Sequence, residues 1–334
     1  MMQINIDINT WQDNSSTIKT FLEQEDDYKQ LCNEVSFTLE KAIEKNKIEY
    51  SNISFRTKSL KSFLEKCERK IYNEPFTEIT DFAGVRLVFL YQSDYINLDK
   101  LVYEFFNVIE KVDKLNNKSV DQFGYGAVHY IVKLKNEHSG PRYDSLKNLK
   151  CELQVRTVLQ DAWSIIDHHL VYKNESEVPS QLRRKLNSLA GLFEIADDQF
   201  NQIRNERSNY INKIEESIKN SDTFLDTEFN IDSFTQYIKY RFEAKDYETH
   251  VLNAKAGYLI AKRYFKEVKN LREIDIALKF EKNSILYKNF FKDFSYSRIN
   301  QFTILIHIIF DLDESGFTSE KAREKIKALK LKIK

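Results

Sequence analysis

The stretch CELQVRTVLQDAW (151–163) gives the clearest indication of a fold in this sequence. Polar and apolar residues alternate through its first half, as in a strand that buries one face, so we expect a strand over 149–157. In such a strand Glu152, Gln154 and Arg156 share one face, and apolar side chains take the other. A row of carboxylate, amide and guanidinium opposite an apolar face is more than a solvent-facing strand requires, which indicates a functional surface.

The segments around this strand predict a sheet covered by helices. Runs rich in β-branched and aromatic residues predict further strands, and apolar residues at helical spacing predict helices between them. We expect strands at 83–91 and 123–134 and helices at 16–46, 60–72, 98–112 and 158–172. Strands interleaved with helices favour an α/β or α+β domain. Of the two we predict α+β, with a mixed β-sheet flanked by helices.

Towards the C-terminus no strand pattern is convincing, and the sequence predicts an all-helical region. One long helix is expected at 182–220, followed by several shorter ones over 230–334. We therefore divide the chain into a first domain, 1–220, with its core at about 50–200, and a helical C-terminal domain, 221–334. The residues of the second domain do not indicate its role.

The composition excludes several classes of protein. Lys plus Arg and Asp plus Glu number 51 each, so no net charge draws the chain to nucleic acid or to a membrane. Cys32, Cys67 and Cys151 have no short spacing, which argues against a disulfide framework and a structural zinc site. The N-terminus lacks a secretion signal, and no apolar run approaches the roughly 20 residues of a membrane span. We expect a soluble cytoplasmic protein without a membrane partner.

Four clusters of residues carry candidate chemistry. The first, RTKSLKSFLEK (56–66), places basic residues and a serine before a helix, where they could bind polyphosphate. Taken alone, such a cluster is more often a solvated basic face. The second, DFAGVRLVF (81–89), has Asp81 just before a strand and Arg86 inside it. An arginine in so apolar a strand needs a partner, and either a nucleotide or a salt bridge to Asp81 would serve.

The third cluster, GYGAVHY (124–130), holds Tyr125 between two glycines. In such a loop the ring is open for stacking on a base, although an ordinary turn with a buried tyrosine explains the pattern as well. His129 follows within a strand. The fourth cluster is the stretch at 151–163, in which Glu152 suits a base or a metal ligand and Arg156 suits a phosphate.

In this order and at these spacings, the four clusters resemble the synthetase domain of the RelA/SpoT family, here of the small alarmone synthetase type with a helical C-terminal extension. The matching positions are Arg56, Lys58 and Ser62, Asp81 to Arg86, Gly124, Tyr125 and His129, and Glu152 to Thr157 with Trp163 and His168. The resemblance covers about residues 50–200. It implies a nucleotidyltransferase-like fold and an ATP:GTP/GDP 3′-pyrophosphotransferase, or GTP diphosphokinase, that makes (p)ppGpp.

The resemblance also implies the roles of individual residues. Asp81 and Glu152 would be the catalytic residues and would hold Mg²⁺, the expected cofactor. The implied ATP-binding residues are Arg56, Lys58, Ser62, Lys66 and Arg86. The implied acceptor-binding residues are Tyr125, His129, Gln154, Arg156 and Asp161.

Two departures from the family pattern leave the acceptor open. Gly126 and Ala127 stand where many synthetases have arginine and serine, which removes an expected contact to the acceptor's 5′-phosphates. Asp161 stands where an amide is expected to read the base. The alternative function is that of a toxic relative that pyrophosphorylates the tRNA 3′ end or makes adenine alarmones. A catalytically dead binding module is disfavoured, because Asp81 and Glu152 are both present.

The sequence also yields expectations about hydrolysis and partners. Every histidine lies at position 129 or later, so the upstream His/Asp set of the family's hydrolase is not found, and we expect synthesis without hydrolysis. We expect the C-terminal helices to support a homo-oligomer or to bind an antitoxin or regulatory partner. Nothing in their residues separates these alternatives.

Overall fold

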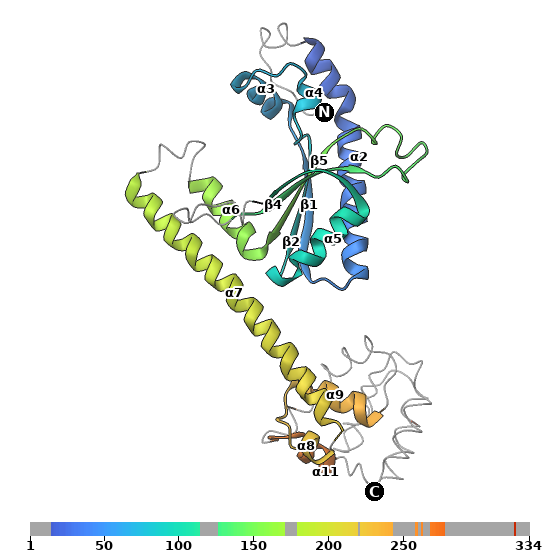
Figure 1. Ribbon diagram of the computed structural model, residues 1–334, viewed down its shortest axis with the longest axis vertical. Coiled ribbons are helices and arrows are strands. Elements are labelled where there is room, and N and C mark those ends of the chain that lie inside the picture. Colours follow the sequence, from blue (N-terminus) through green and yellow to red (C-terminus); the bar gives the residue numbers. More distant parts are fainter. Residues whose placement is uncertain are drawn as a thin grey trace. The chain divides into compact units, whose positions relative to one another are not determined.

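The computed structural model describes residues 15–113, 126–170, 179–219, 221–242, 258–259, 262, 268–277 and 324 (Figure 1). The chain forms two compact units, Met1–Ile203 and Arg204–Lys334. All four predicted clusters belong to the first unit. None of the described helices combines the length and the apolar character that a membrane span requires.

A five-stranded sheet forms the centre of the first unit, with its strands in the order β1-β2-β5-β4-β3. β2 and β5 run parallel, and the other neighbouring pairs run antiparallel. The strands are β1 (Tyr50–Thr57), β2 (Ala83–Phe89), β3 (Phe106–Asp113), β4 (Val128–Leu134) and β5 (Cys151–Thr157). This mixed sheet, with the helices around it, confirms the predicted α+β fold.

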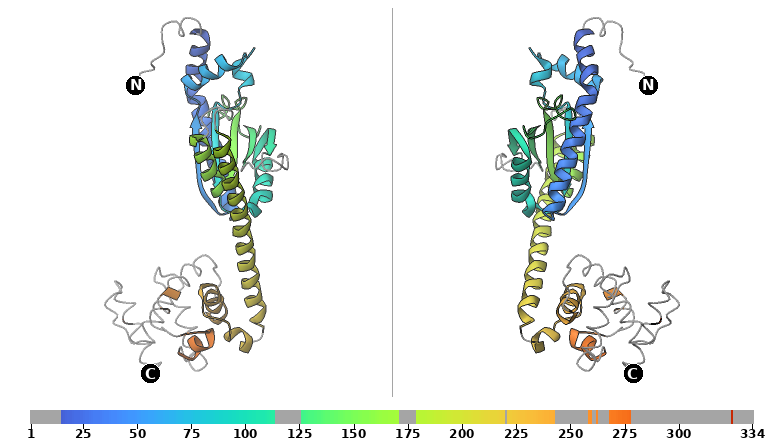
Figure 2. Two further views of the ribbon diagram at one scale, coloured as in Figure 1. Left: turned by 90° about the vertical axis from the view of Figure 1, so that its left-hand side faces the viewer. Right: turned by 90° about the vertical axis from the view of Figure 1, so that its right-hand side faces the viewer.

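Helices lie on both sides of the sheet. α2 and α5 lie on one side and α6 on the other (Figure 1). The helices of the first unit are α2 (Ser15–Lys45), α3 (Leu60–Arg69), α4 (Pro75–Glu78), the 3₁₀ turn η1 (Gln92–Asp94), α5 (Tyr95–Phe105), α6 (Val158–Leu170) and α7 (Ser180–Ser217). The boundary between the two units falls within α7. Figure 2 shows that α2 runs along the sheet for much of its length.

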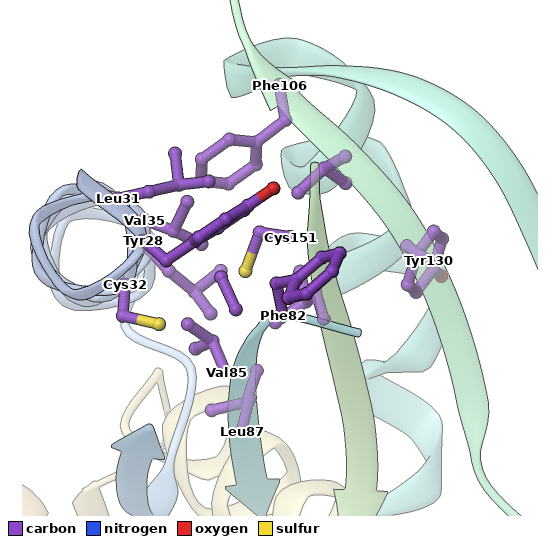
Figure 3. Close-up of a cluster of buried hydrophobic side chains, with 14 of the residues drawn as sticks. Tyr28, Leu31, Cys32, Val35, Phe82, Val85, Leu87, Phe106, Tyr130 and Cys151 are labelled. Atoms are coloured by element: carbon purple, nitrogen blue, oxygen red, sulfur yellow. The ribbon is translucent and has the colours of Figure 1, made fainter. Parts of the chain in front are cut away.

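The packing of α2 against the sheet forms the main core (Figure 3). Leu31, Val35 and Leu39 recur at helical spacing on α2 and are buried, as are Val85 and Leu153 on the strands. Because strand side chains alternate, their neighbours point to the opposite side of the sheet. We call that side the polar face, and its residues are Arg56, Arg86, His129, Glu152, Gln154 and Arg156.

Phe82 ties three helices to the start of β2. Its ring lies 4.9 Å from the ring of Tyr28 on α2, 5.3 Å from Phe63 on α3 and 5.6 Å from Phe76 on α4. Phe21 of α2 adds a further ring at 6.1 Å. Aromatic pairs at these separations stabilise beyond the area that they bury. Asp81, which directly precedes Phe82, is therefore attached to a rigid part of the core.

The two edge strands were the parts of the sheet that the sequence did not predict. The prediction of a helix through 98–112 is wrong at its end, because α5 stops at Phe105 and the chain continues as β3. The strand β1 was not predicted at all. Both strands leave most of their side chains exposed, so neither shows the alternation that marks a half-buried strand. The other predicted elements of the first unit are confirmed within the described residues.

The described part of the second unit is helical, as predicted. Its helices are α8 (Ser221–Leu225), α9 (Ile231–Phe242) and α11 (Leu271–Ala277). Asp275 accepts hydrogen bonds from both Tyr237 Oη, at 2.8 Å, and Arg241, at 2.9 and 3.0 Å, which joins α9 to α11. An isolated bridge pairs Glu228 with Asn270. The predicted domain division at 220/221 stays a prediction.

Candidate functional site

The register of the sheet brings the predicted site residues to neighbouring positions on the polar face. Gly84 of β2 pairs with Arg56 on one side and with Glu152 on the other. At the next level Gln154 of β5 lies between Arg86 of β2 and His129 of β4. A Cβ at Gly84 would lie 3.6 Å from the Arg56 carbonyl oxygen. A side chain at this position would therefore rest against Arg56, and the glycine keeps the surface between Arg56 and Glu152 free of one.

Asp81 lies at one end of the polar face and is held by two lysines. Its carboxylate accepts from Lys58 Nζ at 2.8 Å and from Lys66 Nζ at 2.9 Å. The Lys58 backbone N–H donates to the Phe82 carbonyl, which fixes the end of β1 beside Asp81. Burial acts to raise the pKa of Asp81, but the hydrogen bonds and charges of the lysines outweigh it, so the pKa lies below its usual value. Asp81 is therefore a carboxylate at neutral pH.

Glu152 is held by side chains on either side of it. His129 Nδ1 lies 2.8 Å from Glu152 Oε1, and Gln154 Nε2 donates to Glu152 Oε2 at 3.1 Å. Burial acts to raise the pKa of Glu152, yet the interactions with His129 and Gln154 leave it below its usual value. The negative charge of Asp81 also raises this pKa, so the two carboxylates are within electrostatic reach of each other.

A capping box fixes the entry into α6 at the other end of the polar face. The Gln160 N–H donates to Thr157 Oγ1 at 3.1 Å, and the Thr157 N–H donates to Gln160 Oε1 at 2.9 Å. This reciprocal pair satisfies two backbone donors at the helix start. Trp163, one turn further on, is buried against Leu186 of α7. The first turn of α6 is thereby held rigidly over the sheet.

Asp161, in that first turn, lies between two arginines. Its Oδ1 accepts from Arg86 NH1 at 3.0 Å and lies 3.8 Å from Arg156 NH1. The predicted alternative of a salt bridge between Arg86 and Asp81 is wrong, because Asp81 is taken by the lysines and Arg86 by Asp161. These two aspartates lie at opposite ends of the polar face, a separation that spacing along the chain does not reveal.

Arg156 retains unused hydrogen-bond donors although it is buried. Its NH2 donates to Gln154 Oε1 at 3.0 Å, but Nε and NH1 have no hydrogen-bond partner. Burial lowers its pKa, and the positive charge of Arg86 lowers it further. Buried donors without a partner are uncommon in folded proteins and indicate a place for a ligand.

The family of this region is established by a match over β1 to α6. Residues 55–177 match the family model described as "Region found in RelA / SpoT proteins". The chain contains a RelA/SpoT domain. That span covers the elements that build the polar face and its core, except for the helices α2 and α7.

Relatives with known names resemble the RelA/SpoT domain and its flanks. GTP pyrophosphokinase YwaC of Bacillus subtilis (strain 168) is 27% identical over 157 residues, which cover 45% of this chain and 72% of that protein. GTP pyrophosphokinase YjbM of the same organism is 26% identical over 166 residues, covering 47% and 75%. The crystal structure of small alarmone synthetase 1 from Bacillus subtilis matches with a TM-score of 0.49 and 22% identity, covering 57% of this chain and 98% of that one.

The RelA/SpoT domain brings most of the predicted site residues together. One group of these residues surrounds Asp81, and a second group surrounds Glu152, Arg86 and Asp161. Ser62 is exposed on α3, where its Oγ accepts from Ser59 Oγ at 3.1 Å. Tyr125 lies outside the described residues. Its stacking on a base stays a prediction.

Sequence reasoning named Thr157 only as part of the family motif, and it missed the supporting contacts of Thr157, Gln160 and Asp197. The T-x-x-Q spacing of the first two is a capping-box pattern and could have been found. Asp197 of α7 accepts from Thr157 Oγ1 at 2.6 Å and from Gln92 Nε2 at 3.5 Å. No local pattern connects residues 40 positions apart, so this contact required the structure.

Asp197 should make the stability of the RelA/SpoT domain depend on pH. Burial raises its pKa from an ordinary 3.8 to about 7, against the hydrogen bond from Gln92. Above pH 3.8 the unfolded chain loses this proton while the folded chain keeps it, so stability falls as the pH rises towards 7. We expect Asp197→Asn to remove this loss and to add about 1–2 kcal/mol at pH 8 relative to pH 4.

Thermal unfolding of both proteins at pH 4, 6 and 8 measures the effect. Asp26, exposed on α2, provides the control, since Asp26→Asn removes the same charge without the buried contact to Thr157. A difference between Asp197→Asn and the wild type that stays constant with pH would contradict the assignment.

Proposed function

We propose that this chain transfers the β,γ-pyrophosphate of ATP to the 3′-hydroxyl of GDP or GTP, making (p)ppGpp. The main support is one observation: within a RelA/SpoT domain, two ionised carboxylates stand on a face otherwise lined with cationic and amide side chains. Such a face suits a polyphosphate donor and the charge that moves during its transfer. We place the reaction in the cytoplasm, as the sequence suggested.

Asp81 and Glu152 are the residues that we expect to hold Mg²⁺. Among the described residues no group of three or more His, Cys, Asp or Glu side chains could hold a metal by itself. Two carboxylates nevertheless fit magnesium, which prefers oxygen ligands and takes the rest from water and substrate phosphates. Bound there, the ion would neutralise the phosphates of ATP and orient them. Lys58 and Lys66, which hold Asp81 in this structure, are then available to bind phosphate oxygens.

Glu152 is the residue that we expect to act as the base towards the acceptor. In this step the 3′-oxygen forms a bond to the β-phosphorus, the bond from that phosphorus to the oxygen carried by AMP breaks, and Glu152 takes the hydroxyl proton. His129 and Gln154 hold the carboxylate in one orientation through hydrogen bonds of 2.8 and 3.1 Å. Such positioning contributes much of the rate in phosphoryl-transfer enzymes.

Arg56 and Arg86 are proposed to receive the adenine of the donor. Both belong to the polar face, and Gly84, which lies between Arg56 and Glu152, places no side chain there. Guanidinium groups stack well on aromatic bases. Arg156, with two unused donors, would face the phosphates or the acceptor.

The second candidate function is transfer to the tRNA 3′ end or to adenine nucleotides. Gly126 and Ala127 favour it, because neither can contact the 5′-phosphates of a guanine nucleotide through a charged side chain. We also propose that the second unit binds a partner. This partner would be another copy of the chain, an antitoxin or a regulator. The RelA/SpoT domain contains the proposed residues for either acceptor.

A transfer assay with the full-length protein separates the two functions. We expect label from γ-³²P-ATP to move to GDP or GTP when Mg²⁺ is present and not when it is chelated. GMP, ADP, ATP and deacylated tRNA are offered in separate reactions. Label that moves only to tRNA or to an adenine nucleotide would replace the main proposal by the second. No transfer to any acceptor would contradict both.

A further inference from the structure

The contact between Asp161 of α6 and Arg86 of the polar face has no part in the proposed reaction. We propose that Asp161 is a positioning residue that holds Arg86 away from the donor site and pairs with Arg156 once Arg86 turns to the nucleotide. This inference rests on the proposed function, in which Arg86 receives ATP. It assigns Asp161 a role towards the donor, whereas the sequence suggested a role towards the acceptor base.

The backbone of Asp161 is fixed by contacts on both sides of it. The capping box between Thr157 and Gln160 holds the residues before it, and buried Trp163 holds those after it. From this backbone its carboxylate reaches Arg86 and Arg156 of the sheet. With its backbone held, Asp161 can move only by rotation of its side chain.

The two arginines around Asp161 differ in their freedom to move. The Arg86 side chain is 30% exposed and its NH1 makes the shorter contact, at 3.0 Å. The Arg156 side chain is 9% exposed and is held by Gln154. Arg86 can therefore move away from Asp161, whereas Arg156 stays beside it.

A second partner is already in place for Asp161 when Arg86 leaves. Arg156 NH1 lies 3.8 Å away, just beyond a hydrogen bond, and it has no hydrogen-bond partner. A small rotation of the carboxylate completes that bond, so the aspartate is not left unpaired. An amide at this position would bind Arg86 without the charge and would neutralise neither guanidinium. The aspartate therefore adds a competing ion pair that donor binding must break.

Binding of a methylene-bridged ATP analogue, measured by calorimetry with Mg²⁺, tests the proposal without requiring transfer. We expect Asp161→Asn to tighten binding about threefold, as the loss of a partly exposed ion pair predicts. Asp161→Glu, which keeps the carboxylate, should restore affinity close to that of the wild type. Asp167→Asn removes the same charge about 9 Å further along α6 and should have a smaller effect.

Steady-state kinetics separate this role from base recognition. We expect Asp161→Asn to lower the KM for ATP and to leave the KM for the acceptor unchanged, whereas at a residue that reads the base the exchange of carboxylate for amide would change the acceptor KM. Unchanged or weaker binding of the analogue to Asp161→Asn would overturn the inference and leave the proposed function standing. No binding of the analogue to the wild type would overturn the donor assignment, and the inference with it.

Discussion

Replacing Glu152 by glutamine is expected to reduce pyrophosphate transfer about a thousandfold or more, because the amide neither accepts the hydroxyl proton nor binds a cation well. Glutamine has the same shape as glutamate and still accepts a hydrogen bond from Gln154 or His129. The fold should therefore survive. Initial rates with labelled ATP measure the loss, and thermal unfolding checks the fold.

Glu110 of β3 provides the matched control for this substitution. It is an exposed glutamate on the same side of the sheet as Glu152, separated from it by β4, and the proposed reaction gives it no role. Glu110→Gln should transfer pyrophosphate as fast as the wild type. The assignment of Glu152 is wrong if Glu152→Gln keeps more than a small fraction of the wild-type rate while unfolding at the same temperature.

Replacing Phe82 by alanine is expected to cost about 3–5 kcal/mol of unfolding free energy, the usual range for a buried phenylalanine. Phe82 is 2% exposed, and four aromatic rings from α2, α3 and α4 surround it. The cavity would loosen the segment that carries Asp81, so transfer should fall as well. Urea unfolding followed by circular dichroism measures the stability.

Phe37 offers a comparison on the outer side of α2, where its side chain is 56% exposed. Phe37→Ala should change the unfolding free energy by less than about 1 kcal/mol. Equal losses in the two variants would mean that the ring cluster around Phe82 does not carry the stability assigned to it.

The central strands and the residues on their faces were predictable because burial imposes a period on the sequence. Glu152, Gln154 and Arg156 share one face of β5, and the side chains of Arg86 and Val85 point to opposite faces of β2, as the alternation predicted. The edge strands β1 and β3 bury little and so lack that period. Their pairing with β2 and β4 decides their conformation, which overrides the helical appearance of the residues after 105.

Partners across the sheet were less predictable than faces. A salt bridge from Arg86 to Asp81, five residues away, was one of two partners that the sequence left open, yet Arg86 pairs with Asp161, 75 residues away. That choice depends on where α6 begins and on how β5 lies beside β2. Neither is encoded in the local pattern around Arg86.

The order of the strands has a consequence for the synthesis of the chain. β5 inserts between β2 and β4, so the carboxylates at 81 and 152 meet only after the fifth strand has paired on both sides. Parallel and long-range pairing of this kind forms late and slowly. A ribosome that has translated the chain only to residue 140 has made both arginines of the donor side but not Glu152. The residues of the proposed site are therefore complete only after β5 and the start of α6 have been made.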